Sequence, residues 1–570
     1  MINIIEKKSN KIPTKTSLFV TFDYKQEIVD EIKKLKDVCY WDKKSLEWEM
    51  PITVLSSFIK AVNYYDDIDI TLLDNTVDST EAEHLVQYKV KPMSQQLSAI
   101  EYGLIHNKWL LLDQVGLGKT GSIIYLAEEL YARKEIEHCL IICGKNSLKS
   151  NWENEIKTFS RLDSIILGKK ISKNGIISYA SVKERCEQLK NKINEFFIIT
   201  NIETLQNKEI IEAFNKSKNK IGMIALDEAH VVKDPTSKSG ANLLKLNSKY
   251  KVAATGTLIL NKPTECYTAL KWTDNINCSF TDFKKYYCTL GGNFSKYEIT
   301  GYKHLDLIQD LISNCSLRRL ATKEYIPDLP EKNIINELLD MEDDLFIYKQ
   351  VLKACKAKPT DDLTLLAPDI DKVKLIKGNE LAMATRFKQA TQCPQSLSSK
   401  ITNSTKIDRA CELAEEIINS GNKVIISCYF KDSIKYIAEK LIKYEPLILD
   451  GDTSESDVLK NKELFNNNEN KKLLLFTWPK MGTGHTLTAA NYMICVDTAY
   501  TPGQQEQTEG RIYRKGQNKP VFIYRLFCKN TWDEHCMKLL ESKQAVSDYL
   551  IDNNNDQSIK DAMNEYLNSY

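Results

Sequence analysis

The stretch Asp113-Gln114-Val115-Gly116-Leu117-Gly118-Lys119-Thr120 decides the fold class of the chain. It follows the apolar run Trp109–Leu112 and precedes a segment of helical periodicity. A strand, a glycine-bearing loop and a helix N-terminus together cradle phosphates with backbone N–H groups and the helix dipole. We therefore expect residues 113–120 to bind ATP, with the Lys119 ammonium on the β- and γ-phosphates and the Thr120 hydroxyl on Mg²⁺. The plainer alternative is an ordinary glycine-containing turn.

A second motif lies downstream, where the apolar run Ile224–Leu226 ends in the adjacent acids Asp227 and Glu228. Side chains at the end of a parallel strand emerge at the carboxyl edge of the sheet, where ligands bind. Asp227 is then placed to hold Mg²⁺ and Glu228 to orient or deprotonate the attacking water. An acidic pair alone is more often a helix cap, but the upstream phosphate loop favours catalysis.

The segment from Gln507 to Gln517 carries Arg511 and Arg514, two of only ten arginines in the sequence. Their three-residue spacing predicts two guanidinium groups on one face of a helix. There they would neutralise charge on a transferring γ-phosphate, as arginine fingers do. A solvated basic face or a contact with DNA phosphates is the alternative. The scarcity of arginine favours the finger, because lysine cannot reproduce the planar guanidinium fork.

The composition limits the class of protein. The chain has 570 residues, 42% hydrophobic and 27% charged, which is typical of a folded globular protein with several domains. A formal net charge of +1 excludes a protein whose whole surface is basic and covers nucleic acid, so any phosphate-binding surface must be a local patch. The 15 cysteines are dispersed without a CxxC pair, which argues against a disulfide framework or a zinc ribbon.

Several features bear on where the protein acts. The sequence has no apolar stretch of membrane-spanning length and no apolar signal core near Met1. We expect an intracellular protein without a membrane partner, cytoplasmic or associated with the nucleoid. Usage rich in lysine and asparagine indicates an AT-rich genome, bacterial or viral.

Two series of short apolar runs alternate with helical segments, which predicts two parallel sheets flanked by helices. The first series covers Trp109–Leu112, Cys139–Cys143, Phe196–Thr200, Ile221–Leu226 and Lys251–Ala254, and the second covers Lys423–Cys428, Leu447–Leu449, Lys472–Thr477, Tyr492–Val496 and Val521–Arg525. The expected domains are a small α+β module at 1–75, an α/β lobe at 80–275, helical extensions and a connector at 276–400, a second α/β lobe at 401–545 and a tail at 546–570.

With these motifs in this order, the chain resembles the Swi/Snf-like family of superfamily-2 helicase-related DNA translocases. An aspartate at the position of Asp113 is typical of the phosphate loop in that family, and Asp227-Glu228-Ala229-His230 looks like its DEAH box. The resemblance implies two RecA-like lobes and gives roles to further residues. Gln96 would read adenine, Asn151-Trp152-Glu153 matches the segment after the second strand, Leu317-Arg318-Arg319 resembles the lobe connector, and Thr200, Thr255, Gly256, Thr257, Gly482, Gly484 and Gln507 would contact DNA or couple the lobes.

Some positions depart from the family pattern. Gly144 stands where the family usually has proline, Leu258 where proline usually follows Thr-Gly-Thr, and His485 and Thr486 replace the usual leucine and asparagine. These departures cast more doubt on the coupling of ATP hydrolysis to stepping along DNA than on ATP hydrolysis itself. The short middle insertion also makes a nucleosome-specialised remodeller a poor fit.

The first 75 residues include a predicted hairpin with Trp41 and Trp48 on its two arms, after a strand at 17–22 and a helix at 24–35 and before a second helix at 54–62. Paired tryptophans of this kind are usually core residues. They could instead stack on unpaired bases. The module resembles the HARP module of annealing helicases in Phe22-Asp-Tyr24 and in Tyr40–Trp48.

We therefore expect an α/β protein that is a DNA-dependent ATPase using Mg²⁺ with ATP. The predicted function is translocation on duplex DNA, with sequence-independent binding and remodelling of forked or branched DNA in repair or replication. A strand-separating DNA helicase and an ATP-gated clamp or protein-displacing factor are the alternatives. The catalytic candidates are Lys119, Asp227, Glu228, Arg511 and Arg514.

Overall fold

The structure, a computed structural model of the chain, divides into two compact units. It describes residues 2–9, 12, 14, 16–22, 26–34, 39–42, 45–51, 58, 68–71, 84–144, 148–171, 177–291, 295, 298–356, 362–371, 380–478 and 486–552. The first unit holds Met1–Gln114, Gly118–Leu320 and Ala545–Tyr570, and the second holds Val115–Leu117 and Ala321–Gln544.

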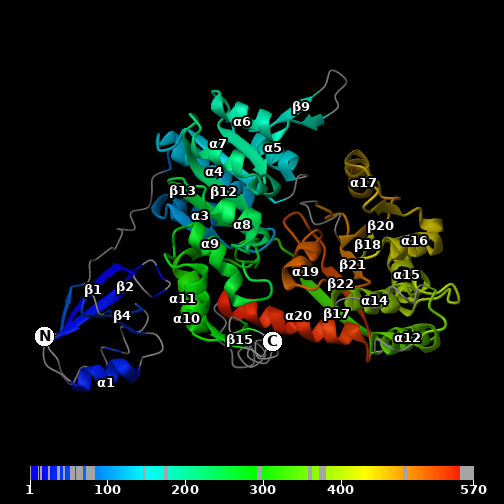
Figure 1. The fold of residues 1–570 in the computed structure, drawn as a ribbon. Helices are drawn as coiled ribbons and strands as arrows, with labels where there is room; N and C mark the ends of the chain where they lie inside the picture. The colour runs from blue at the N-terminus through cyan, green and yellow to red at the C-terminus, as the bar shows by residue number, and fades with distance from the viewer. Residues whose placement is uncertain are drawn as a thin grey trace. The chain divides into compact units, whose positions relative to one another are not determined.

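A seven-stranded parallel sheet forms the centre of the first unit in the described part of the chain, in the order β16-β6-β13-β12-β7-β11-β8. Figure 1 labels β12 and β13 of this sheet among the helices of the unit. Its strands are β6 (Lys108–Leu111), β7 (His138–Cys143), β8 (Ser164–Ile166), β11 (Phe197–Asn201), β12 (Ile221–Asp227), β13 (Tyr250–Ala254) and β16 (Ser316–Leu317). Every residue of β11 and β13 is buried, as in a parallel sheet whose two faces are covered by helices. The predicted first RecA-like sheet is confirmed.

The helices of the first unit pack around this sheet and supply the rest of its apolar core. They are α3 (Ser94–Ile105), α4 (Lys119–Ala132), α5 (Leu148–Phe159), α6 (Val182–Lys190), α7 (Lys208–Asn215), α8 (Lys238–Leu243), α9 (Tyr267–Trp272), α10 (Phe280–Tyr287) and α11 (Leu305–Asn314). The core joins Trp109 of β6 to Ile123 and Leu126 of α4 and to Trp152 of α5. The helix after the phosphate loop is therefore fixed to the sheet by buried apolar contact.

The N-terminal module folds as a small α+β layer, as expected. Its sheet, among the residues described there, has the order β3-β4-β2-β1-β5, antiparallel except for the parallel pair of β1 and β5. The elements are β1 (Ile2–Lys8), β2 (Thr16–Phe22), α1 (Gln26–Lys34), β3 (Tyr40–Asp42), β4 (Glu47–Met50) and β5 (Ile68–Thr71). Ile28 and Ile32 of α1 are buried on its core. Apart from Phe58, the second expected helix lies outside the described residues.

The second unit has its own parallel sheet, in the order β17-β22-β21-β18-β20-β19 over the described residues. Its strands are β17 (Lys332–Leu339), β18 (Val424–Cys428), β19 (Leu447–Leu449), β20 (Leu473–Thr477), β21 (Tyr492–Cys495) and β22 (Val521–Cys528). All five strands expected from the sequence are present. The edge strand β17 comes from the stretch expected to be helical extensions and connector.

Helices on this second sheet include one whose start is set by a side-chain cap. The helices are α12 (Leu345–Lys356), α13 (Leu363–Leu366), α14 (Glu380–Gln392), α15 (Thr405–Asn419), α16 (Lys431–Lys440), α17 (Glu455–Asn467), α19 (Pro502–Glu509) and α20 (Trp532–Leu550). The Ser404 hydroxyl accepts a hydrogen bond from the Ile407 backbone N–H, the usual first-turn cap. Ile407, Ala410 and Ala414 then follow at helical spacing, all buried on the sheet.

Helix α20 begins in the second unit, but residues from Ala545 onward belong to the first. The Gln309 amide of α11 donates a hydrogen bond to the Tyr549 carbonyl at 2.7 Å. Arg318 pairs with both carboxylate oxygens of Asp552 and donates to the Leu112 and Gly256 carbonyls. The first unit is thus completed by residues that follow the second in sequence. None of the helices in the described ranges is both long enough and apolar enough to cross a bilayer.

Candidate nucleotide-binding and hydrolysis site

The phosphate loop lies where the sequence predicts it, between β6 and the N-terminus of α4. Gly116 and Gly118 adopt the left-handed backbone region, with φ of +98° and +81°, which glycine enters at little cost. Gly118 is also the N-cap residue of α4, so the first N–H groups of the helix face the loop. Val115–Leu117 groups with the second unit, where Leu117 is buried with Ile326 and Leu329.

Gln96 lies against this loop from α3. Its Nε2 donates to the Gly118 carbonyl at 3.2 Å, and its Oε1 accepts from the Met93 N–H at 2.9 Å. A Cβ atom at Gly118 would lie 2.8 Å from Gln96 Nε2, and one at Gly121 only 2.5 Å from it. Glycine at both positions therefore lets the Gln96 amide pack directly on the loop backbone.

Lys119 folds back onto its own loop. Its Nζ donates to the Asp113 carbonyl at 2.7 Å and lies 3.4 Å from the Gln114 carbonyl oxygen. The ammonium is thus held at the loop, at the place where phosphate oxygens would accept its protons.

Asp113, expected to bind nucleotide, instead has a fully buried side chain that pairs with Arg319. Arg319 Nε donates to Asp113 Oδ1 at 2.9 Å, its Nη2 donates to Oδ2, and its Nη1 donates to the Gln95 carbonyl. One guanidinium therefore ties the start of the phosphate loop to the residue before Gln96. The sequence placed Arg319 only in a segment that resembles the lobe connector and gave it no such role.

We predict that this ion pair holds the loop and that its two halves are coupled. Arg319→Met should destabilise the first unit by about 3–5 kcal/mol, because it leaves a buried carboxylate without its partner. Adding Asp113→Leu to that variant should recover much of the loss. Urea denaturation of the parent, both single variants and the double variant measures the coupling.

Arg409→Met is the matched control, because Arg409 forms a half-exposed ion pair with Glu337 in the second unit. Such pairs contribute about 0–1 kcal/mol, so its denaturation curve should move little. A double variant as unstable as the sum of the two single variants would rule out the coupling.

The predicted acidic pair lies at the carboxyl end of β12. Asp227 Oδ1 accepts from the Glu228 N–H at 2.9 Å, and its Oδ2 accepts from Trp152 Nε1 at 3.0 Å. Burial and the neighbouring Glu228 raise the pKa of Asp227, while the Trp152 hydrogen bond and the charge of Lys119 lower it. The effect of Lys119 reflects the closeness of the phosphate loop and the acidic pair. Trp152 was matched by sequence only as part of a segment, without a role.

Glu228 has a left-handed backbone, with φ of 53° and ψ of 49°, which is uncommon for a residue with a side chain. Strained backbone of this kind clusters at functional sites. A Cβ atom on Gly144 would lie 3.3 Å from Glu228 Cβ, so a larger residue there would press on the glutamate. The departure at Gly144 therefore falls directly beside the predicted catalytic residue.

The Thr255-Gly256-Thr257 segment follows β13, which lies between β6 and β12 in the sheet. His230 Nδ1 lies 2.9 Å from Thr255 Oγ1 and 3.3 Å from Glu228 Oε2, and the Thr257 N–H donates to Thr255 Oγ1 at 3.1 Å. Burial lowers the pKa of His230 to about 4, so its ring is neutral at neutral pH. The structure thus connects the acidic pair to the predicted coupling segment through a neutral imidazole.

Thr200, predicted to contact DNA or couple the lobes, is the penultimate residue of β11. It is buried, and its Oγ1 donates to Thr204 Oγ1 at 2.9 Å, which in turn donates to Asn201 Oδ1 at 2.7 Å. This hydroxyl is engaged within the first unit.

In the second unit, Gln507 lies on α19, but the helix ends at Glu509 with Gly510 as its C-cap residue. Arg511 and Arg514 therefore lie in the following turn, and the expectation that a helix carries them is wrong. The Gln517 amide holds this turn by donating to the Ala490 carbonyl at 2.7 Å and to the Ile512 carbonyl at 3.2 Å. Gly482 and Gly484 lie outside the described residues.

The side chains fit a bound Mg²⁺. Asp227 offers a carboxylate and Thr120 a hydroxyl, the oxygen ligands that this hard cation prefers. Thr120 lies in the helix that follows β6, and Asp227 is the last residue of β12 in the same sheet. The nearby Lys119 would share the phosphates with the metal.

Comparison with known proteins agrees with this arrangement of motifs. A family model described as an SNF2-related domain matches residues 70–406, and one described as a helicase conserved C-terminal domain matches residues 405–516.

Individual relatives share about a quarter of their aligned residues with this chain, and the alignments cover most of it. An uncharacterized ATP-dependent helicase of Mycoplasma pneumoniae is 25% identical, over 88% of this chain and 46% of that protein. The putative ATP-dependent helicase/translocase YwqA of Bacillus subtilis is 25% identical, over 84% of this chain and 51% of that protein. This chain thus spans about half the length of these two relatives.

Two further matches are a curated relative and a solved structure. A Drosophila melanogaster protein named SWI/SNF-related matrix-associated actin-dependent regulator of chromatin subfamily A-like protein 1 is 22% identical, over 92% of this chain and 66% of that protein. The solved Sulfolobus solfataricus SWI2/SNF2 ATPase core in complex with dsDNA is 24% identical, covering 86% of this chain and 99% of that one, with a TM-score of 0.38.

Proposed function

Since the chain belongs to the SNF2-related family, whose catalytic core is that of a DNA-dependent ATPase, we propose that it is an ATP-driven translocase on double-stranded DNA that remodels forked or branched DNA. The observation that carries the proposal is the joining of three motifs at one edge of the first sheet. The phosphate loop, the acidic pair and the Thr255 segment follow β6, β12 and β13, and His230 connects the last two.

In the proposed reaction each residue has one task. The loop N–H groups and Lys119 bind the β- and γ-phosphates. Glu228 orients the attacking water and accepts its proton, and the neutral His230 keeps the Glu228 carboxylate and Thr255 in register. Mg²⁺, held by Thr120 and Asp227, would neutralise charge on the phosphate oxygens when bound. Arg511 and Arg514 stabilise the charge that develops on the transferring phosphoryl group.

Movement along DNA would follow from changes in the contacts between protein and DNA that accompany ATP hydrolysis. Contacts with phosphates position a protein without reading sequence, so binding should be independent of sequence and should weaken as salt rises. The relatives named as a helicase/translocase and as a SWI/SNF-related regulator support this class of activity. Such a protein would act on intracellular DNA.

The proposal is tested by measuring ATP hydrolysis without nucleic acid and with single-stranded, duplex and forked DNA. Displacement of a triplex-forming strand and separation of a duplex are measured beside it. Duplex-stimulated hydrolysis with triplex displacement and little strand separation is the expected result. Strong strand separation would favour a helicase, and hydrolysis without displacement would favour an ATP-gated clamp.

We further propose that residues 1–75 help to choose the DNA structure. Trp41 and Trp48 form a cross-strand pair with ring centroids 5.4 Å apart. Trp41 is 39% exposed, whereas Trp48 is half-buried and packs on the module core. Because an exposed ring can stack on an unpaired base, Trp41 is the better candidate for a contact at a junction. Resemblance to the HARP module of annealing helicases supports the same role.

Deleting residues 1–75 should spare hydrolysis on plain duplex and reduce the preference for forked DNA, because the first predicted ATP-site residue is Gln96. Trp41→Ala should reproduce this loss while the module stays folded. Trp48→Ala is the contrasting variant and should unfold the module. Hydrolysis rates on forked and plain duplex give the preference, and circular dichroism reports folding. Equal fork preference in the full-length and truncated proteins would leave the module without this role.

A further inference from the structure

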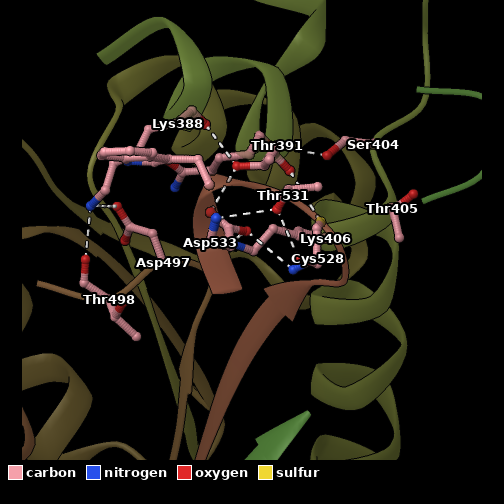
Figure 2. Close-up of polar contacts among 12 residues, drawn as sticks. Lys388, Thr391, Ser404, Thr405, Lys406, Asp497, Thr498, Cys528, Thr531 and Asp533 are labelled. Atoms are coloured by element: carbon pink, nitrogen blue, oxygen red, sulfur yellow. Dashed lines mark hydrogen bonds and ion pairs between the residues drawn. The ribbon is translucent and has the colours of Figure 1, made fainter. Parts of the chain in front are cut away.

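A buried charge network lies beyond the carboxyl ends of the strands in the second sheet (Figure 2). It contains two lysines and two aspartates, Lys388, Lys406, Asp497 and Asp533, each less than a tenth exposed. Charges are rarely buried to this degree unless they are paired. The network divides into two ion pairs whose surroundings differ.

The pair Lys406–Asp533 is well satisfied. Lys406 Nζ lies 2.7 Å from Asp533 Oδ2, the Thr391 hydroxyl donates to Asp533 Oδ1 at 3.0 Å, and the Cys528 N–H donates to Oδ2 at 3.2 Å. These residues belong to α14, α15, α20 and the end of β22. This pair therefore holds helices to the sheet, and its role is structural.

The pair Lys388–Asp497 is much less complete. Asp497 Oδ1 accepts from Trp478 Nε1 at 2.8 Å, but Oδ2 accepts no hydrogen bond from the described residues, and Lys388 Nζ lies 3.6 Å from it. Lys388 instead donates to the Thr498 carbonyl at 2.8 Å and lies 4.0 Å from the centre of the Tyr500 ring. Lys388 thus contacts the backbone of Thr498 and the ring of Tyr500, which closely follow Asp497 in sequence.

The contacts of Asp497 join two segments that are separate in sequence. Trp478 directly follows β20 and begins the segment that carries Gly482 and Gly484. Thr498 and Tyr500 begin the segment that leads through α19 to the turn with Arg511 and Arg514. Asp497 and Lys388 therefore touch the first residues of both segments to which the sequence assigns coupling and catalysis.

An incompletely satisfied buried carboxylate is costly, and a buried ion pair adds little net stability compared with apolar packing. The neighbouring Lys406–Asp533 pair already supplies the structural link. We propose that Lys388, Asp497 and Trp478 are positioning residues that hold the start of the arginine-bearing segment and the start of the segment after β20 in register. This inference rests on the proposed function, because it assigns these residues a role in ATP turnover.

The proposal predicts a loss of turnover with little loss of ATP affinity. Trp478→Phe keeps an aromatic ring but removes the N–H donor, and Asp497→Asn keeps the shape but removes the charge. Each should lower kcat for DNA-stimulated ATP hydrolysis about 10–100-fold, since a misplacement of about 1 Å can cost 10²-fold. The KM for ATP should stay within about twofold, because the predicted ATP-contacting residues lie on other elements.

Lys388 provides the test by rescue. Lys388→Met should lower kcat as Trp478→Phe does, and Lys388→Arg should recover a substantial part, because a guanidinium retains the charge, the donors and the stacking on Tyr500. Lys406→Met is the matched control in the same network. It should lower the melting temperature but leave kcat per folded molecule near the parental value, with folded protein counted by binding of a fluorescent ATP analogue.

The parent protein is assayed beside all variants. Loss of kcat in Trp478→Phe and Asp497→Asn at constant KM, with rescue by Lys388→Arg, would support the positioning role. Parental kcat in the folded Trp478→Phe and Asp497→Asn variants would overturn it. A parent whose hydrolysis is not stimulated by any DNA would overturn the proposed function itself, which is a separate result.

Discussion

Glu228→Gln should bind ATP with near-parental affinity and hydrolyse it about 10²–10⁴-fold more slowly, the usual contribution of a general base. The substitution keeps the size of the side chain and its left-handed backbone, so the site should stay assembled. The glutamine can still face the attacking water but cannot accept its proton. Phosphate release measures turnover, and equilibrium binding of a fluorescent ATP analogue measures affinity. Hydrolysis by this variant at the parental rate would remove Glu228 from the catalytic role.

Lys119→Ala should give the opposite pattern, with ATP binding itself lost. In the proposed reaction Lys119 holds phosphate, whereas Glu228 acts on water, so the two variants separate binding from chemistry. The Lys119 ammonium already lies on the loop carbonyls of Asp113 and Gln114. Although Lys119→Ala removes these contacts, the loop should not collapse, because Asp113 at its start stays paired with Arg319. Unchanged ATP affinity in this variant would place the phosphates elsewhere.

Arg511→Ala and Arg514→Ala should each lower kcat at least about 10²-fold, with smaller changes in ATP affinity. The reason is that a positive charge aimed at the transferring phosphoryl group acts most strongly in the transition state. The measurement is DNA-stimulated ATP hydrolysis over a range of ATP concentrations, which separates kcat from KM.

Lysine substitutions provide the sharper comparison at the same two positions. Arg511→Lys and Arg514→Lys keep the positive charge but lose the planar fork, so they should restore little activity. Near-normal turnover in both alanine variants would move the two arginines out of the active site and into a DNA or structural contact.

The sequence predicted the parts of the site that depend on local chain order. Each buried strand reads as an apolar run, and a loop or an acidic pair at its end falls at the carboxyl edge of a parallel sheet. The positions of the phosphate loop, Asp227 and Glu228 at this edge were therefore predicted directly. The Arg511–Arg514 spacing was misread as helical because spacing does not show where a helix ends, and here it ends at Glu509.

Other features depend on residues that meet only in the folded chain. Arg319 and Asp113 are 206 residues apart in sequence, and the partner of a buried charge is set by packing. The Lys388–Asp497 pair is of the same kind. The sequence drew attention to Arg319 only as part of the segment that resembles the lobe connector. Strand β17, at an edge of the sheet, was missed because its polar and apolar residues come in pairs, as Lys-Asn-Ile-Ile-Asn-Glu-Leu-Leu, and so give neither a continuous apolar run nor an alternation.

The return of the chain to the first unit at Ala545 makes the second unit an insertion within the first. A fragment that stops at Leu320 therefore lacks part of its own host domain. In such a fragment Arg318, a mostly buried cation, has lost both oxygens of Asp552 while it still contacts the Leu112 and Gly256 carbonyls. An intact first unit thus requires two separate pieces of sequence, residues up to 320 and residues from 545, joined by a linker in place of the inserted domain.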